Sequence, residues 1–353
     1  MKKLTEIRAR LFLLFVIFSG AYNAKAQNKP ALVSPLLTGH YMPGIINIRD
    51  FADPSPATGI ILLDYNVFPS SSKFYGADGK QITQIKGPLG SNIDLNVDIG
   101  GYINTPFPVF ASKFKILGAT YMGGATLGYT TTNISEGLSR IGSIDSTHQS
   151  GKVNADVHGI SDLGVMPIFL SWGLKQMDIT AGYMFYAPTG NYEPGGSNNT
   201  GLGYWSHLFQ CFLYYYPMKI GGKPSKALAI MFATTFELTS KIKNTDVNPG
   251  NRFDLDYGIS QYLSERFSFG IYGGNSWQVS EDQGSQVYWN SSIKDRYGVL
   301  GFQAAYWLWT NRLQVIGKYG FNYGVVQNFK LNTVEINFVF ITNALTGNKS
   351  QKK

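Results

Sequence analysis

The alternation of apolar and polar side chains in residues 93–99 (IDLNVDI) constrains the fold of this chain more than any other feature. Successive side chains of a strand point to opposite faces, so strict alternation predicts a strand with two unlike faces. The apolar face comprises Ile93, Leu95, Val97 and Ile99. The polar face comprises Asp94, Asn96 and Asp98. A soluble sandwich turns such a polar face to water, whereas a transmembrane barrel turns its apolar face to lipid and its polar face to the interior.

The same pattern recurs in weaker form along most of the chain, and no segment shows the sustained 3.6-residue period of a helix. Most segments match the roughly 9–11 residues that a tilted strand needs to cross a membrane. About twelve of them follow residue 58, within a range of about 10 to 14 because boundaries shift by roughly two to four residues. They lie near 59–68, 93–103, 115–129, 159–174, 177–187, 204–217, 227–239, 251–262, 267–279, 297–309, 312–322 and 331–341. We therefore expect an all-β fold, a transmembrane antiparallel β-barrel of about 12 strands.

The links between these segments alternate in length. Short links lie at 175–176, 264–266 and 310–311. Longer polar links fall at 130–158, 188–203, 240–250 and 280–296. Short turns on one side and long loops on the other are the arrangement of outer-membrane barrels. An even number of strands then leaves both ends of the barrel sequence on the short-turn side.

Two later segments indicate which side chains face the interior. In 251–262 the residues expected to point outward are Phe253, Leu255, Tyr257 and Ile259, and those expected to point inward are Arg252, Asp254 and Asp256. In 312–322 the outward set is Leu313, Val315 and Tyr319, and the inward set is Arg312, Gln314 and Lys318. The aromatic clusters at 214–216 and 307–309 lie at segment ends, where we expect them to form interfacial girdles.

Composition agrees with a membrane barrel. The chain is 44% hydrophobic and 15% charged, against about 25% charged residues in a typical soluble domain. Residues 1–26 are expected to be a signal peptide, because basic residues precede an apolar run at 11–18 and an A-x-A site at 24–26. That signal holds five Lys or Arg and one Glu, so the net charge falls from +8 to +4 without it. A balance this mild predicts no nucleic-acid partner.

No pattern of catalytic or metal-binding residues is found. The histidines are His40, His148, His158 and His207, and none belongs to an H-E-x-x-H motif or a His and carboxylate cluster. His158 and Ser161 are three positions apart and would face opposite sides of a strand. The single cysteine, Cys211, rules out an internal disulfide. We therefore expect no enzyme activity, no metal and no cofactor.

Residues 27–58 contain five prolines, which prevent a long strand ladder. We expect this segment to fold partly into the lumen as a plug or constriction. Its candidate residues are His40, Tyr41, Arg49 and Asp50, and the candidates on the wall are Asp94, Asn96, Asp98, Arg252, Asp254 and Asp256. The wall residues either line a pore of mixed charge or form salt bridges that close a narrow barrel. Replacing Arg252 and Asp254 should change conductance or selectivity if they line a pore.

Three groups of short motifs resemble one known family. The first group is 39–44 (GHYMPG) and 48–51 (IRDF), followed by 59–66 (GIILLDYN); the second is 189–192 (TGNY) with 201–205 (GLGYW); the third is 245–257 (TDVNPGNRFDLDY). Together, in this order, they resemble the phenol meta-pathway degradation proteins, also described as SphA-like outer-membrane transporters. The resemblance implies an outer-membrane β-barrel that passes hydrophobic or aromatic compounds. Two departures are the polar tail that follows the last segment and the link at 130–158, which matches no family motif.

These observations predict four regions: a signal peptide (1–26), a Pro-rich segment (27–58), a β-barrel (59–341) and a polar tail (342–353). We expect a non-catalytic channel in the outer membrane of a Gram-negative bacterium, in contact with outer-membrane lipid. Its partner is expected to be a small hydrophobic or aromatic solute. The alternatives are a sealed structural barrel without transport and a secreted soluble β-sandwich that binds other molecules. The oligomeric state stays open.

Overall fold

The computed structural model describes residues 38–54, 59–86, 92–141, 148–194, 196, 198–217, 219–220, 223–224 and 227–342. The predicted signal peptide and residues 343–353 of the predicted tail lie outside these ranges. The regular structure described is β throughout. Within the same ranges, no helix combines the length and the apolar character needed to cross a membrane.

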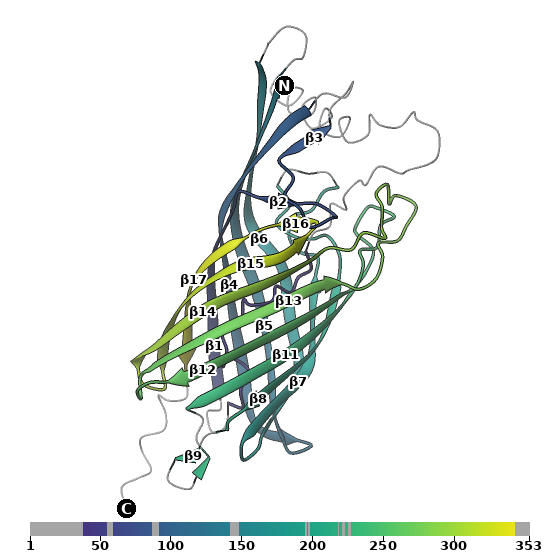
Figure 1. Cartoon of the computed structure of the whole chain (residues 1–353). Helices are drawn as coiled ribbons and strands as arrows, with labels where there is room; N and C mark the ends of the chain where they lie inside the picture. Colours follow the sequence, from purple (N-terminus) through teal and green to yellow (C-terminus); the bar gives the residue numbers. More distant parts are fainter. Residues whose placement is uncertain are drawn as a thin grey trace, which may run out of the picture.

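Strands wind into a closed barrel (Figure 1). The main sheet has thirteen strands, of which twelve form the barrel and β3 (Gln84–Lys86) pairs only with β4. β1 (Gly59–Ser71) pairs with both β4 (Asn92–Ile116) and β17 (Asn332–Ile341), and these two pairings close the sheet. All strand neighbours are antiparallel. The predicted barrel of about 12 strands is confirmed, and the alternative of a soluble sandwich is wrong.

The remaining barrel strands occur in the predicted order, and all but β5 and β6 keep close to the predicted bounds. They are β5 (Ala119–Ile141), β6 (His148–Gly173), β7 (Met177–Ala187), β8 (Ser206–Tyr215), β11 (Leu228–Thr239), β12 (Arg252–Tyr262), β13 (Phe267–Gln278), β14 (Arg296–Trp309) and β15 (Leu313–Val326). Short pairs join β2 (Phe74–Tyr75) to β16 (Asn328–Phe329) and β9 (Lys219–Ile220) to β10 (Lys223–Pro224). We call the end of the barrel with the short turns the inner end and the end with the long loops the outer end.

Three neighbouring strands are much longer than predicted. β4, β5 and β6 span 25, 23 and 26 residues and extend beyond the other strands at the outer end (Figure 1). Most of the predicted loop at 130–158 is therefore strand, with pairing that continues to Ile141 and His148. At the inner end β4 and β5 meet in a tight turn at Leu117 and Gly118, which both have positive φ. Such two-residue turns match the twist of a hairpin.

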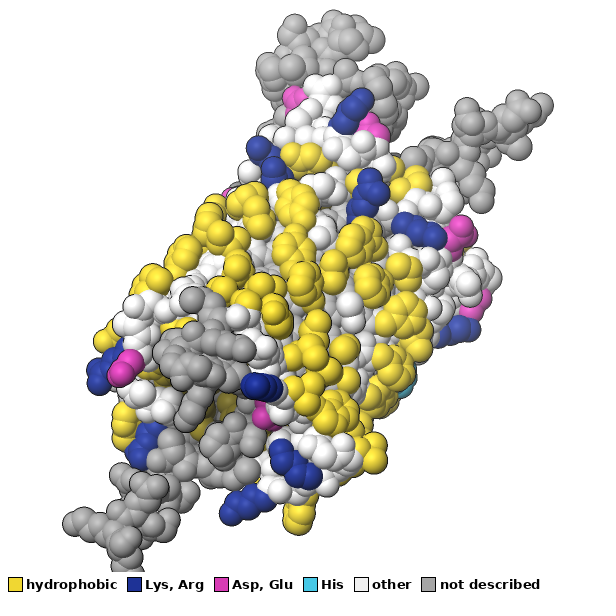
Figure 2. All heavy atoms as spheres, turned by 60° about the horizontal axis from the view of Figure 1, so that its bottom comes forward, with side chains coloured by type: hydrophobic (Ala, Val, Ile, Leu, Met, Phe, Trp, Pro, Cys, Tyr) yellow, Lys and Arg dark blue, Asp and Glu magenta, His cyan; other side chains and the backbone are white. Residues whose placement is uncertain are grey.

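An apolar belt surrounds the barrel. Large hydrophobic side chains stay exposed on many strands, including Phe110, Phe232, Ile259, Phe302 and Ile336. Figure 2 shows hydrophobic side chains, in yellow, gathered over the visible face of the wall, with Lys and Arg side chains mostly toward its two ends. A soluble protein rarely exposes an apolar surface this extensive, whereas a transmembrane barrel requires one.

The predicted facing holds for β12 and β15 and is wrong for the outer part of β4. Asp254 and Lys318 are buried, while Ile259 and Tyr319 are exposed. In β4, by contrast, Val97 and Ile99 are buried, and Asn96 and Asp98 are exposed. The alternation runs on from the membrane-level part of the strand, where Val109 is buried and Phe110 exposed. The outer part of β4 therefore has its polar face outside, as a strand in water does.

The aromatic clusters at 214–216 and 307–309 are divided between the two faces of the wall. Tyr215, Leu308 and Trp309 are exposed, as expected for a girdle. Tyr214 and Tyr216 are buried inside the barrel, so this part of the girdle prediction is wrong. Two-residue periodicity explains the division at 214–216, because neighbours on a regular strand face opposite ways. At 307–309 a register shift between Trp307 and Trp309 interrupts the alternation, so both Leu308 and Trp309 are exposed.

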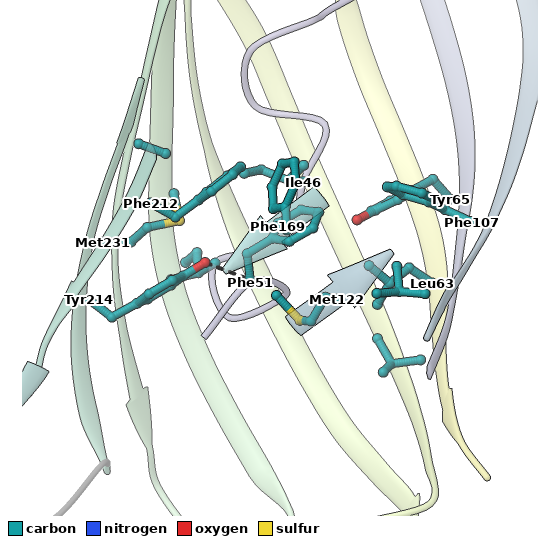
Figure 3. Packing of buried hydrophobic residues seen from close by; sticks show 14 of the residues in the cluster. Ile46, Phe51, Leu63, Tyr65, Phe107, Met122, Phe169, Phe212, Tyr214 and Met231 are labelled. Carbon is teal, nitrogen blue, oxygen red and sulfur yellow. Dashed lines mark hydrogen bonds between the residues drawn. The ribbon is translucent and has the colours of Figure 1, made fainter. Parts of the chain in front are cut away.

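The lumen contains part of the chain itself. Residues 38–54, called here the lumen segment, run within the barrel from near the outer end of β8 to near the inner ends of β6 and β7. Ile46, Ile48 and Phe51 of the segment join the buried apolar side chains of the wall in one cluster. Figure 3 shows Phe51 between Phe212 and Tyr214 on one side and Leu63 and Tyr65 on the other. The core of this protein is thus the interface between the lumen segment and the wall.

Candidate functional site

The lumen segment has irregular backbone, so its polar groups need partners other than a strand neighbour. Turns provide a few: the N–H groups of Ile45 and Asp50 donate to carbonyls three residues earlier. Side chains of the wall provide most others. The N–H of Ile48 donates to Gln303 at 3.1 Å, and the carbonyl of Phe51 accepts from the Thr180 hydroxyl at 2.7 Å. The inward polar residues of the barrel thus act as backbone partners for the segment.

Lys318 makes three of these hydrogen bonds. Its Nζ donates to the carbonyls of Gly44, Ile45 and Ile46 and lies 3.0 Å from a carboxylate oxygen of Glu335. The Lys318 side chain is fully buried. A buried ammonium is tolerated only when its charge is paired and its protons are all accepted. The ion pair and the three carbonyls together meet this condition.

Asp256 of β12 contacts the same turn of the segment. Its carboxylate accepts from the Tyr41 hydroxyl at 2.6 Å and from the N–H of Gly44 at 2.5 Å. Gly44 has a φ of 85°, and a Cβ built there would meet Val299 at 2.7 Å, so the close approach requires glycine.

His40 anchors the outer end of the segment. Its ring nitrogens lie 2.7 Å from the Ser206 hydroxyl and 2.9 Å from an Asp162 carboxylate oxygen. Its backbone N–H donates to Glu237. The ring also stacks on Tyr186 with 4.6 Å between centroids. Ser206, His40 and Asp162 together resemble a hydrolase triad. However, Ser206 is fully buried and its hydroxyl donates to Glu237, so this serine cannot reach a substrate carbonyl.

The other two charged candidates of the segment lie at its inner end. Arg49 donates to the Ser260 hydroxyl at 2.8 Å and stacks over the Tyr262 ring. Asp50 accepts from the Tyr65 hydroxyl at 2.6 Å and from the N–H of Asn47. Both residues thus join the segment to strands on different sides of the lumen.

Arg252 and Asp254 belong to β12 of the wall, and their side chains are buried inside the barrel. Arg252 forms a bidentate ion pair with Asp295, with N–O distances of 2.6 and 2.9 Å. Asp254 lies on the same face of β12 and is fully buried. This arrangement agrees with salt bridges that fill the interior, one of the two readings of these residues.

The remaining candidates are elsewhere. Asp94, Asn96 and Asp98 lie on the outer part of β4, where Asp94 accepts from Gln84 at 2.7 Å. They lie away from the lumen segment, on the outer part of β4. Conversely, several residues that hold the segment were not among the candidates, namely Asp162, Tyr214, Glu237, Gln303 and Lys318. Only their inward register on a strand could have indicated them.

Two cavities remain beside the lumen segment. The outer chamber has a volume of about 400 Å³ and lies between the segment and strands β1 and β4 to β8. Tyr41, Ile46, Phe107, Met184 and Tyr186 contribute to its lining, and loop residues 199–202 bound it at the outer end. No Lys or Arg is among its lining residues in the described part of the chain. The chamber is therefore mainly apolar, with hydroxyl, imidazole and amide groups at its margins.

The inner chamber is smaller, about 190 Å³, and lies nearer the inner end. Leu63, Val109, Met122 and Trp307 line its apolar part, and Arg49 and Asp50 of the segment also face it. Among the residues described, no group of three or more His, Cys, Asp or Glu side chains is placed to hold a metal ion.

A closed barrel with an apolar belt and an interior cavity defines an outer-membrane barrel of Gram-negative bacteria, with the fold of a channel. Residues 71–338 match the family described as "Putative MetA-pathway of phenol degradation", and the chain belongs to that family. A search of curated protein sequences finds no match.

Solved structures of outer-membrane proteins resemble this chain to different degrees. The COG4313 outer membrane channel from Pseudomonas putida F1 superposes with a TM-score of 0.58 at 14% identity, covering 83% of this chain and 98% of that chain. A FadL homologue from Pseudomonas aeruginosa gives a TM-score of 0.40 at 11% identity, covering 90% and 99%. The translocator domain of the autotransporter NalP from Neisseria meningitidis gives 0.39 at 10% identity, covering 83% and 91%.

Proposed function

We propose that this protein is a channel through which small, neutral, hydrophobic or aromatic compounds cross the outer membrane. The observation that carries the proposal is the outer chamber, an apolar cavity of about 400 Å³ bounded by outer-loop residues. Sites for small molecules are typically concave and apolar, with a few polar groups that orient the ligand. The family description, which refers to phenol degradation, supports an aromatic cargo.

The charges around the chamber favour a neutral solute over an anion. Asp162 is the carboxylate that lines it, and no Lys or Arg of the described chain does so. An anion entering this cavity would lose its hydration without meeting a Lys or Arg, which is unfavourable. The His40 imidazole in the lining already contacts the carboxylates of Asp162 and Glu237. A neutral aromatic ring would instead contact Tyr186, Phe107 and Met184.

A matched pair of dyes tests the proposal. N-Phenyl-1-naphthylamine is neutral, and 8-anilino-1-naphthalenesulfonate carries a sulfonate on nearly the same skeleton. We expect cells that produce the protein to take up the neutral dye several-fold faster than cells that do not, with little change for the anionic dye. Equal entry of the neutral dye with and without the protein contradicts the proposal.

A variant that fills the chamber provides the control. Met184 lines the outer chamber and is nearly buried, so Met184→Trp adds volume where the solute is expected to pass. The faster entry of the neutral dye should then be lost while the barrel still shows its heat-dependent shift in gel mobility. Unchanged dye entry in Met184→Trp would mean that the solute does not pass through this chamber.

A further inference from the structure

Among the described residues, one side chain is shared by the linings of the two chambers. Phe51 is the residue that lines both the outer and the inner chamber. Its ring stacks on Phe212 with 4.5 Å between centroids and lies near Phe107 at 6.5 Å. Phe51 is 5% exposed, so little open space surrounds it. The ring therefore stands as a partition between two cavities.

Three strands of the wall show that the chambers follow one another along the lumen. On β1, Tyr65 lines the outer chamber and Leu63 the inner one. The same change occurs on β4 between Phe107 and Val109. On β5 it falls between Thr126, which lines the outer chamber, and Met122, which lines the inner one (Met122 is labelled near Phe51 in Figure 3). The cavities are thus stacked along a common wall.

A hydrogen bond crosses the same boundary. The Tyr65 hydroxyl, on the wall, donates to Asp50 of the lumen segment at 2.6 Å. Tyr65 lines the outer chamber and Asp50 the inner one, so this contact joins segment and wall at the partition. Tyr65 lies on the β1 side of the Phe51 ring (Figure 3).

The backbone at the partition is held, which leaves the ring as the part that can move. The N–H of Phe51 donates to the Tyr214 hydroxyl at 3.2 Å, and its carbonyl accepts from Thr180 at 2.7 Å. A rotation about χ1 would shift the ring without breaking either bond, since side chains move between staggered rotamers.

We propose that the two chambers are consecutive sites on one path along β1, β4 and β5, and that Phe51 with the Asp50–Tyr65 hydrogen bond is the gate between them. The class of solute rests on the function proposed above, whereas the continuity of the path does not. Small ions can report the path whatever solute it serves.

Single-channel conductance in planar bilayers, with potassium chloride as the only electrolyte, tests the gate. We expect Phe51→Ala to join the two cavities and raise the conductance several-fold over the unaltered protein. Met184→Ala and Met122→Ala are the matched controls, because each removes buried apolar volume from one chamber only. A folded Phe51→Ala barrel that conducts no better than these controls overturns the proposal.

Two further variants keep the test decisive. Phe51→Leu replaces the alanine variant if that variant does not fold. Leucine is apolar but smaller than phenylalanine, so we expect a conductance above that of the unaltered protein, with a smaller increase than alanine would give. Tyr65→Phe removes the hydrogen bond with almost no loss of volume, and we expect more frequent brief openings. An opening frequency equal to that of the unaltered protein removes this bond from the gate. Adding Met184→Trp to Phe51→Ala should suppress the conductance, because cavities in series share one current.

The dye assay separates this proposal from the proposed function. Conductance that rises in Phe51→Ala without faster entry of the neutral dye supports the gate and contradicts the solute class. Faster dye entry in the unaltered protein, combined with no effect of Phe51→Ala on conductance, supports the solute class and overturns the gate.

Discussion

The two sides of the lumen differ in how they meet the lumen segment. The wall from β11 to β17 contacts the segment through polar side chains such as Asp256, Gln303 and Lys318. The wall from β4 to β6 instead lies across the outer chamber from the middle of the segment, and among the described residues it makes polar contacts only near the two ends of the segment, through Asp162 with His40 and Thr120 with Asp53. No described residue of β11 to β17 contributes to the outer chamber. Buried polar side chains therefore mark where the segment is fastened. The outer chamber, which is the proposed site of the solute, lies along the opposite wall.

The largest effect on stability is expected in the wall from β11 to β17, at Lys318. Lys318→Met leaves Glu335 as a buried charge without its partner and three carbonyls without a donor. Breaking a buried ion pair in this way costs about 3–5 kcal/mol. The temperature at which the barrel loses its folded gel mobility should fall clearly. Lys113→Met, at an exposed position of β4, is the control and should leave that temperature unchanged.

One substitution made on both sides tests the comparison directly. Thr235 on β11 is fully buried and accepts from the Gln210 amide at 3.0 Å, whereas Thr105 on β4 lines the outer chamber. Thr235→Val should cost about 1–3 kcal/mol, because the amide of Gln210 loses its partner. Thr105→Val should be nearly neutral for stability and should speed entry of the neutral dye. Equal losses of stability in urea unfolding would contradict the distinction between the two sides.

The smallest effect is expected outside the lumen, where Asp246 joins two outer loops. Its carboxylate accepts from Lys241 at 2.6 Å and from the N–H and hydroxyl of Ser285. The hydrogen bond from Lys241 is the largest of the contacts that hold the pKa of Asp246 below its ordinary value. A lowered pKa means that this contact is present above the unfolded pKa of about 3.9 and is lost as the pH falls through the folded value.

Hydrogen exchange of the Ser285 amide measures this contact. Protection should be the same at neutral pH and at mildly acidic pH, because the carboxylate stays ionised in both. Asp246→Asn should reduce the protection slightly at neutral pH, with the barrel amides unaffected. Asp78→Asn, in another exposed ion pair, serves as the control. Protection that already falls at mildly acidic pH would contradict the lowered pKa.

Sequence reasoning located the barrel strands because alternation is a local property. The inward register of Arg252, Asp254 and Asp256 followed directly from it, and the structure confirms that all three are buried. The same reasoning reversed the outer part of β4, because alternation does not show whether the surroundings are lipid or water. Asn96 and Asp98 lie on a strand that extends past the rest of the barrel, so their polar face is the outer one.

For the candidate site, the sequence singled out His40, Tyr41, Arg49 and Asp50 in a Pro-rich segment, while its role as a plug remains a prediction. Their partners could not be found in the same way, since His40 meets Asp162 and Glu237 across 122 and 197 positions of the chain. The chambers were equally out of reach, because a cavity is what packing leaves between distant elements. Thus the sequence alone determined the number, period and order of the strands, through steric preferences of neighbouring residues. Only the closure of the barrel decided which polar groups hold the lumen segment and where Phe51 divides the space beside it.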